Sequence, residues 1–252
     1  MQTNKWLSYG DFAWTESIIT SSADYEDETE FYVNLIKENA QTETKNLLYL
    51  GCGAGGNDYT FKKHFKVTEV DISGKMLEIP RKANPEVTYL RGDMRSVDLN
   101  ERFGVVTIPD SIDYMVKLPE LQSAIAAAFK HLIPGGVLLT VAKTREELRE
   151  NNFCYTGAKD DVEITIFENN YFPKQAPSIY EAILVYLIRH EGKLSIYTDI
   201  HRLGLFSQAE WISLFEDAGL KVKQARLDGV YDPFILGQGE YPTKVFIGVK
   251  PR

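Results

Sequence analysis

Three closely spaced glycines and one aspartate form the pattern with the clearest chemical meaning in this sequence. An apolar run, residues 47–50, ends in the glycines Gly51, Gly53 and Gly55. Such a run is typical of a buried strand that enters a tight turn, and a helix beginning near Gly56 would present free backbone N–H groups to a ligand. Asp71 stands 20 residues after Gly51, at the end of a second predicted strand, 67–70. A carboxylate there can accept hydrogen bonds from both hydroxyls of a ribose, so the pattern predicts a site for a ribose-bearing ligand.

The glycine spacing alone leaves the ligand open. With Gly56 as its third glycine the loop matches the dinucleotide fingerprint G-x-G-x-x-G, and with Gly55 it matches the G-x-G-x-G of enzymes that use S-adenosylmethionine (SAM). A glycine turn without any ligand is a third interpretation, which the position of Asp71 disfavours.

Three later segments distinguish these interpretations. A predicted third strand, 87–90, runs into Gly92-Asp93, and a fourth, 103–108, ends in a polar cluster. A helix end near Leu132, a Pro-Gly-Gly turn and a fifth strand up to Val141 follow. In this order the segments resemble the class I SAM-dependent methyltransferases, and the resemblance covers residues 47 to about 141.

Shorter matches resemble one branch of that family. They are Asp24-Tyr25 before a predicted helix, the segment 110–114 after the fourth strand, and the segment 201–207 near the end of the chain. They are similar to the branch that methylates small molecules, which includes amino-sugar N,N-dimethyltransferases.

The resemblance implies SAM as the cofactor and assigns residues to its parts. The glycine loop would face the methionine end, Asp71 the ribose, and Ile72 the adenine, whose amino group would donate to Asp93. Met76 is assigned to the same site, with ordinary helix core as the alternative. The full set of implied cofactor-binding residues is Trp14, Tyr25, Gly51, Cys52, Gly53, Gly55, Asp71, Ile72, Met76, Asp93, Met94, Pro109 and Asp110.

The sequence departs from the family pattern at three positions. Tyr49 stands where the family usually has an acidic residue, and Gly104 where an aspartate is usual. Trp14 stands where sugar-methylating relatives have a tyrosine that closes over the cofactor. These departures keep a SAM-binding protein without catalysis as an alternative to an enzyme.

Methyl transfer is an in-line displacement, so the protein chiefly positions the acceptor and manages one proton. His201 has the right pKa range for taking a proton and lies at the end of a predicted strand, and Tyr114 is the second catalytic candidate. The alternatives are a structural histidine bonded to a carbonyl and a tyrosine that only packs. Further candidates for the acceptor site are Asp110, Asp113, Tyr231, Asp232 and Glu240. The acidic residues among them predict a small-molecule acceptor with an amine.

A nicotinamide-dependent oxidoreductase is the rival enzyme. Tyr155 and Lys159 match the Tyr-x-x-x-Lys of short-chain dehydrogenases, but so do Tyr59 and Lys63 inside a predicted helix. A two-residue pattern that occurs twice carries little information.

The elements that must position these residues follow from hydrophobic periodicity. Strand–helix alternation over 47–141 predicts an α/β fold with a doubly wound, mostly parallel seven-stranded sheet. A helix over 24–39 with Phe31, Leu35 and Ile36 on one face precedes it. The SAM-binding core is assigned to 24–160 and 203–252, and an antiparallel lid or dimerisation sheet to 161–202. A helix over 207–218 with Ser207 as its N-cap, and strands 220–222 and 244–249, complete the core, with a loop from 229 to 241.

Composition bounds the class of protein. The chain has 252 residues, a net charge of −8 and two cysteines, one of them in the glycine loop. The acidic balance disfavours nucleic acid as a partner, and the absence of a long apolar run predicts no membrane span. Without an apolar signal core or a zinc-like Cys/His spacing, the sequence predicts a cytoplasmic, metal-free protein, with a homodimer as a possible assembly.

Overall fold

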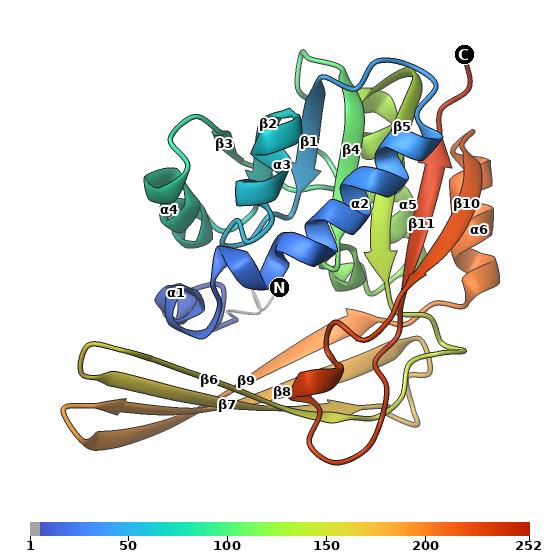
Figure 1. The fold of residues 1–252 in the computed structure, drawn as a ribbon. Helices are drawn as coiled ribbons and strands as arrows, with labels where there is room; N and C mark the ends of the chain where they lie inside the picture. The colour runs from blue at the N-terminus through green and yellow to red at the C-terminus, as the bar shows by residue number, and fades with distance from the viewer. Residues whose placement is uncertain (1–5) are drawn as a thin grey trace.

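The computed structural model describes residues 6–252 and contains two sheets (Figure 1). The larger sheet has the strand order β10-β11-β5-β4-β1-β2-β3. Its strands are β1 (Asn46–Leu50), β2 (Lys66–Asp71), β3 (Thr88–Arg91), β4 (Phe103–Pro109), β5 (Leu132–Ala142), β10 (Lys221–Leu227) and β11 (Thr243–Val249). Strand β11 is antiparallel to both of its neighbours, and the pairs from β5 to β3 are all parallel. The predicted doubly wound, mostly parallel sheet of seven strands is confirmed.

Helices cover both faces of this sheet (Figure 1). They are α2 (Glu26–Asn39), α3 (Asp58–His64), α4 (Gly74–Ala83), α5 (Leu118–His131) and α6 (Gln208–Asp217). Helices α5 and α6 bury residues such as Ile125 and Trp211 against one face. Helices α2 and α3 bury Ile36 and Phe61 against the other. Strand β4 is buried along its whole length, as expected for a central parallel strand covered on both sides.

The helix before the first strand begins later than the sequence predicted. Residues Ser22–Tyr25 form a 3-10 turn, η2, closed by a capping box between Ser21 and Asp24, and α2 proper starts at Glu26. Its fully buried face is formed by Tyr32, Val33 and Ile36, whereas the predicted Phe31 and Leu35 border this face and are partly buried. The register of the face is therefore about one residue from the predicted one. The difference arises because Tyr32 is buried with its hydroxyl paired to Glu28.

The smaller sheet has the order β6-β7-β8-β9 and is antiparallel throughout. Its strands are β6 (Asn152–Lys159), β7 (Val162–Tyr171), β8 (Ile179–His190) and β9 (Lys193–Gly204). Strand β6 was not identified from the sequence, so the sheet begins earlier than residue 161. The predicted tight turn between β8 and β9 is present, with positive φ angles at Glu191 and Gly192.

The small sheet lies across the carboxyl ends of the parallel strands (Figure 1). A short helix, α1 (Glu16–Ile19), contacts β6, and Cβ atoms cannot be added at Gly157 because the Ile18 carbonyl oxygen would be 2.2 Å away. The loop after β10 contains a 3-10 turn, η4 (Asp232–Phe234), and descends to the small sheet. We call this small sheet, residues 152–204, the lid sheet.

Two smaller expectations concern the second half of the chain. Ser207 caps α6 through a capping box with Glu210, and Gly219 ends it with a φ of 88°, as predicted. Strand β5 already begins at Leu132, which pairs with Phe103, so the Pro-Gly-Gly segment is an irregularity of the strand rather than a turn before it. In residues 6–252 no helix combines the length and apolar character needed to cross a membrane.

Candidate functional site

A cavity of ≈ 1560 Å³ lies between the carboxyl edge of the large sheet and the lid sheet. Its upper wall is the glycine loop after β1, the end of β2 and the segment after β4. Its lower wall includes residues from all four lid strands, and its rim includes the loop after β10. The cavity therefore joins the predicted cofactor site to the predicted acceptor site.

The glycine loop has the backbone that its sequence predicts. The φ angles of Gly51, Gly53 and Gly55 are 76°, 57° and 75°, which only glycine adopts without strain. A Cβ on Gly51 would lie 2.3 Å from the Ser111 hydroxyl oxygen, and one on Gly56 would lie 2.6 Å from the Tyr25 ring. A Cβ on Gly53 would meet nothing closer than 3.7 Å. The loop is thus tightly packed from behind at both ends and open toward the cavity in the middle.

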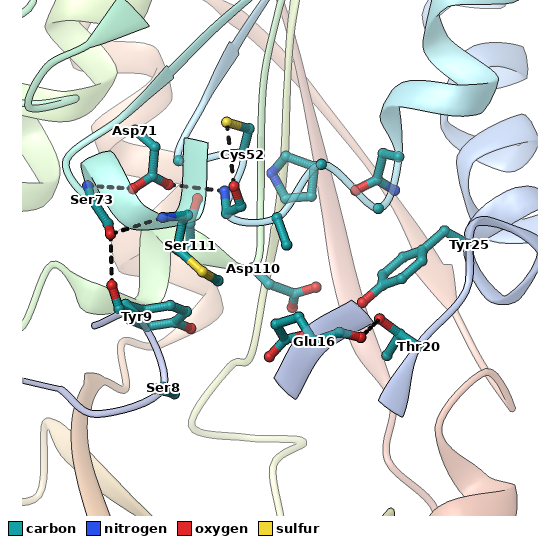
Figure 2. A pocket seen from close by; sticks show the side chains of 18 of the residues that line it. Ser8, Tyr9, Glu16, Thr20, Tyr25, Cys52, Asp71, Ser73, Asp110 and Ser111 are labelled. Atoms are coloured by element: carbon teal, nitrogen blue, oxygen red, sulfur yellow. Dashed lines mark hydrogen bonds between the residues drawn. The ribbon is translucent and has the colours of Figure 1, made fainter. Parts of the chain in front are cut away.

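Asp71 joins the glycine loop to the end of β2 (Figure 2). Its Oδ2 accepts a hydrogen bond of 2.9 Å from the Gly53 N–H, and its Oδ1 accepts one of 2.7 Å from the Ser73 N–H. Burial raises the pKa of Asp71, and these two backbone N–H groups oppose that rise. Each carboxylate oxygen retains a second lone pair, so the group can hold the loop and still accept from ribose hydroxyls.

The side chains predicted to surround the adenine lie beside Asp71. Ile72 is 56% exposed and lines the cavity, as an apolar platform for a flat ring would. Asp93 also lines the cavity, but Arg95 donates to both of its oxygens, at 3.0 Å from Nε to Oδ1 and 2.5 Å from Nη2 to Oδ2. This pairing holds the pKa of Asp93 below its ordinary value. Asp93 is therefore an ionised acceptor, with Arg95 as a partner that the sequence analysis did not identify.

These residues fit SAM as a cofactor. The loop leaves an unfilled space at Gly53, Asp71 offers free lone pairs, and Ile72 offers an exposed apolar surface in the same cavity. The methionine end of SAM suits the space at Gly53, a ribose suits Asp71, and a flat base suits Ile72.

The departure at Tyr49 is compensated by other buried polar groups. The Tyr49 hydroxyl donates to Asn57 Oδ1 at 2.9 Å, and the Asn57 amide donates to the Thr29 hydroxyl at 2.8 Å. Glu69 lies opposite Tyr49 in the parallel β1–β2 register and is fully buried beside Asp58. Burial and the neighbouring Asp58 carboxyl raise the pKa of Glu69 well above its ordinary value. The acidic support behind the loop is therefore on β2, where Glu69 is held as a neutral acid.

We predict that Glu69→Gln removes part of the pH dependence of stability. A raised folded-state pKa means that the folded protein keeps a proton which the unfolded chain loses above about pH 4.3. Stability is then greatest below that pH and falls as the pH rises toward the folded-state pKa, by up to about 1.4 kcal/mol per pH unit for one group. Urea unfolding between pH 5 and 8.5 should show a shallower decline in Glu69→Gln than in the wild type. The exposed Glu38→Gln on α2 is the control, and an identical decline in all three proteins would contradict the assignment.

His201 lies at the lid side of the cavity, but its ring is only 3% exposed. Its Nε2 lies 2.9 Å from Asp199 Oδ2, and its Nδ1 lies 2.5 Å from the Tyr114 hydroxyl. Burial acts to raise the pKa of Asp199, but hydrogen bonds from His201 and Ser8 hold it below its ordinary value. Ionised Asp199 fixes the proton of His201 on Nε2, which leaves Nδ1 free to accept the Tyr114 proton.

Tyr114 continues this chain of polar groups toward the cofactor side. Its hydroxyl lies 2.8 Å from the Tyr9 hydroxyl, and the Tyr9 carbonyl accepts a hydrogen bond from the Ser73 hydroxyl (Figure 2). Burial raises the pKa of both phenols far above the physiological range, so they are protonated. The two predicted catalytic residues are thus in contact, and Tyr9 and Tyr114 form a hydrogen-bonded path from the cavity to Nδ1 of His201.

Lys143 follows β5 and was not identified from the sequence. Its Nζ lies 2.5 Å from Asp110 Oδ1 and 3.4 Å from Asp113 Oδ2. Burial would lower the pKa of Lys143, but Asp110 and its other acidic neighbours raise it above its ordinary value. The predicted acceptor-site residues Asp110 and Asp113 are therefore occupied by an internal cation. The sequence could have indicated Lys143, because this residue follows β5 and therefore lies at the same carboxyl edge of the sheet as Asp110, which follows β4.

Several residues predicted from the sequence lie away from the cavity or turn their side chains from it. Trp14 is 41% exposed and does not line the cavity, because its 3-10 turn, η1 (Ala13–Thr15), holds it on the outer side. Tyr9, five residues earlier, does line the cavity. Glu240 is exposed, and Asp232 accepts from the Tyr241 N–H. Cys52 and Met76 contribute to the wall but are 5% and 2% exposed, with Cys52 packed in the core beneath the loop. The remaining predicted cofactor residues Tyr25, Met94, Pro109 and Asp110 line the cavity.

The pattern that suggested a dehydrogenase has no counterpart in the structure. Tyr155 and Lys159 lie on β6, where four residues span about 13 Å, so the two side chains do not meet. The Tyr155 hydroxyl donates to Glu168 at 3.2 Å, and Lys159 is exposed. Tyr59 and Lys63 form a surface cation–π contact on α3.

Comparisons with known proteins agree with this arrangement. Residues 47–136 match a family model described as a methyltransferase domain. The chain is 28% identical over 227 residues to a dTDP-3-amino-3,4,6-trideoxy-alpha-D-glucopyranose N,N-dimethyltransferase of Streptomyces venezuelae, covering 79% of this chain and 85% of that protein. It is 24% identical to a dTDP-3-amino-3,6-dideoxy-alpha-D-glucopyranose N,N-dimethyltransferase of Streptomyces fradiae, covering 79% of each.

Solved structures share the whole architecture. Streptomyces venezuelae DesVI superposes with a TM-score of 0.76 at 26% identity, over 91% of this chain and 92% of that one. SAM-bound CalS10, an amino pentose methyltransferase from Micromonospora echinaspora, has a TM-score of 0.74 at 20% identity, over 99% and 100% of the two chains. The second likeness concerns the fold alone.

Proposed function

We propose that this chain, a SAM-dependent methyltransferase, transfers a methyl group to an amine nitrogen of a small-molecule acceptor that binds between the glycine loop and the lid sheet. The matching methyltransferase domain covers the glycine loop and Asp71, and the relatives named above are N,N-dimethyltransferases of amino sugars. The observation that carries the proposal is the chain of polar groups from Tyr9 through Tyr114 to His201, which starts beside Ser73, the hydrogen-bond partner of Asp71, and ends at an ionised carboxylate.

The chemistry divides between the cofactor and the protein. When bound, SAM would supply an activated methyl carbon, so that the new N–C bond forms as the C–S bond breaks and S-adenosylhomocysteine leaves. The nitrogen must present a lone pair, so an ammonium group has to lose a proton first. Tyr114 can take that proton as it passes its own to His201 Nδ1, and Asp199 then stabilises the imidazolium that forms. The Tyr9 hydroxyl is hydrogen-bonded to the Tyr114 hydroxyl and can carry the proton from the acceptor to Tyr114.

The buried surroundings suit this transfer. His201 is stacked against the Trp6 indole at a centroid distance of 5.9 Å and meets the Tyr9 ring edge-on at 5.5 Å. These aromatic rings keep the imidazole orientation fixed and exclude water from it. His201 therefore acts through Tyr114 rather than by touching the acceptor.

An assay with methyl-labelled SAM tests the function. The protein is incubated with labelled SAM and amines of graded size, and products are separated into small-molecule, protein and nucleic-acid fractions. We expect N-methylated small molecules, identified by mass spectrometry, with one or two methyl groups on one nitrogen. Label in protein or nucleic acid alone would contradict the proposal. SAM binding without any product would favour the alternative of a non-catalytic SAM-binding protein.

A homodimer remains a proposal about assembly. The outer face of the lid sheet, turned away from the cavity, exposes Phe167, Ile196 and Ile200. A second copy of the chain would cover this exposed apolar face, and the lid sheet, which is an open antiparallel sheet, has edge strands that can pair with another copy. Light scattering at micromolar concentration decides between a mass near 28.6 kDa and twice that value.

A further inference from the structure

We propose that the acceptor carries no phosphate and bears a second amine, bound as a cation by Glu168 of the lid sheet and Glu28 of α2. This inference rests on the proposed function and names its substrate class. It separates this chain from the relatives above, whose printed names describe sugars attached to dTDP, a nucleoside diphosphate.

The first argument is the charge of the cavity wall on the acceptor side. We call the part of the wall formed by the lid sheet, α2, the segment after β5 and the loop after β10 the acceptor half. Among described residues, Lys143 is the cation that lines this half, and it is already paired with Asp110 and Asp113. The other basic residues of the wall, Lys62, Arg91 and Arg95, come from α3, β3 and the segment after β3, on the cofactor side. Lys62 and Arg95 are paired with Glu86 and Asp93. No unpaired cation of the described wall therefore faces the acceptor.

A diphosphate would be costly in such a place. Proteins bind phosphate with arginine forks, lysines or clustered backbone N–H groups, because a buried anion needs charge-assisted hydrogen bonds to replace water. The acceptor half instead presents the carboxyl groups of Glu28 and Glu168, which repel a diphosphate whenever they are ionised. The wall thus selects against anionic acceptors.

Glu168 is a carboxyl group with spare acceptor capacity. It lies on β7 and lines the cavity, and its Oε2 accepts one hydrogen bond, of 3.2 Å, from Tyr155. Burial raises the pKa of Glu168, and nearby Lys143 and Tyr155 only partly oppose this. Asn170, two residues along on β7, is fully buried, does not line the cavity, and likewise opposes the rise in the pKa of Glu168. The hydrogen bond from Tyr155 leaves further lone pairs of the Glu168 carboxyl group, which a bound amine can satisfy.

Glu28 provides the second carboxyl group, from the opposite wall. Its Oε1 accepts from Tyr32 at 2.7 Å and its Oε2 from Tyr231 at 3.2 Å. Burial, with Asp110 nearby, raises the pKa of Glu28 to about 7. A cation beside it would favour the ionised form, so the site gains from binding an ammonium group.

Phenol rings complete the acceptor half. The cavity wall there includes Tyr155, Tyr180, Tyr231 and Tyr241. Aromatic faces attract ammonium groups, and phenol hydroxyls suit the hydroxyls of a sugar or an amino alcohol. The volume of ≈ 1560 Å³ exceeds the roughly 300–1,000 Å³ of an ordinary ligand site, so an acceptor of sugar size fits beside the cofactor.

Calorimetry tests the inference without requiring turnover. The protein is first saturated with S-adenosylhomocysteine, the demethylated product of SAM, and then titrated with dTDP or with neamine, a phosphate-free aminoglycoside fragment with several amines. We expect neamine to bind at least about tenfold more tightly than dTDP. Equal or tighter binding of dTDP, or no binding of either probe, would overturn the proposal. Failure of S-adenosylhomocysteine itself to bind would count against the proposed function instead.

Matched variants locate the effect. Glu168→Gln keeps the shape of the side chain and removes its charge, so neamine affinity should fall about 10- to 100-fold while S-adenosylhomocysteine affinity is unchanged. Glu163→Gln, an exposed glutamate five residues earlier on β7, should alter neither affinity. Equal neamine affinity in Glu168→Gln and Glu163→Gln would refute the role of Glu168.

Discussion

Asp71→Ala should lower the affinity for SAM roughly 30- to 1000-fold. The substitution removes an acceptor of two charge-assisted hydrogen bonds from a ribose, which costs on the order of 2–4 kcal/mol. It also frees the N–H groups of Gly53 and Ser73, which Asp71 now binds at 2.9 and 2.7 Å. The glycine loop then loses its link to β2, so we expect a value toward the upper end of the range. Isothermal titration with SAM measures the change.

Two controls separate binding from folding in that experiment. Glu78→Ala on the exposed face of α4 lies close in sequence and should bind SAM as the wild type does. Circular dichroism checks that Asp71→Ala retains the fold. A folded Asp71→Ala protein with wild-type SAM affinity would exclude Asp71 from the cofactor site.

Tyr114→Phe and His201→Gln should each lower kcat about 10²- to 10⁴-fold, the range typical of general acid–base catalysis, while SAM affinity stays nearly unchanged. Tyr114→Phe removes the hydroxyl that lies 2.5 Å from His201 Nδ1, and His201→Gln removes the group that receives the proton. Because the two residues act in one relay, the double variant should be no slower than the slower single variant. Steady-state kinetics with the amine acceptor provides the measurement.

The pH–rate profile distinguishes a relay from a lid that only excludes water. If His201 receives the proton, the pH–rate profile of His201→Gln should differ in shape from that of the wild type. Tyr171→Phe, an exposed tyrosine at the end of β7, serves as the control. Retention of both the wild-type kcat and its acidic limb in His201→Gln would show that the acceptor loses its proton to solvent.

The backbone of the glycine loop and the position of Asp71 at the end of the next strand could be predicted from the sequence because this geometry is local. A glycine loop fixes its own backbone, and Asp71 reaches it through the parallel pairing of two consecutive strands. The periodicities that gave the seven strands are equally local. The prediction of Trp14 as a cofactor contact had no such support, since the path of the chain before α2 is set by contacts with distant elements such as β6.

The acceptor half could not be predicted in the same way. Lys143 and Asp110 are 33 residues apart, and Glu28 and Tyr231 are 203 residues apart. No periodicity in a single sequence reports such pairings. Strand β6 was missed for a related reason, because its alternation is interrupted by Gly157, which is required where α1 crosses it. His201 was identified by its residue type, but its burial behind Tyr114 depends on the segment that begins the described chain.

The segment around Ser8 determines the order in which parts of the site can form during synthesis. The Ser8 N–H and hydroxyl bind Asp199, and the hydroxyl also meets His201, across sequence separations of 191 and 193 residues. During synthesis at roughly 5–20 residues per second, the first part of the chain must wait on the order of 10–40 s for these partners to emerge. The large sheet can assemble its first four parallel strands within that time. On this timing the glycine loop and Asp71 would assemble well before the proposed proton relay, which closes only when the segment around Ser8 meets β9.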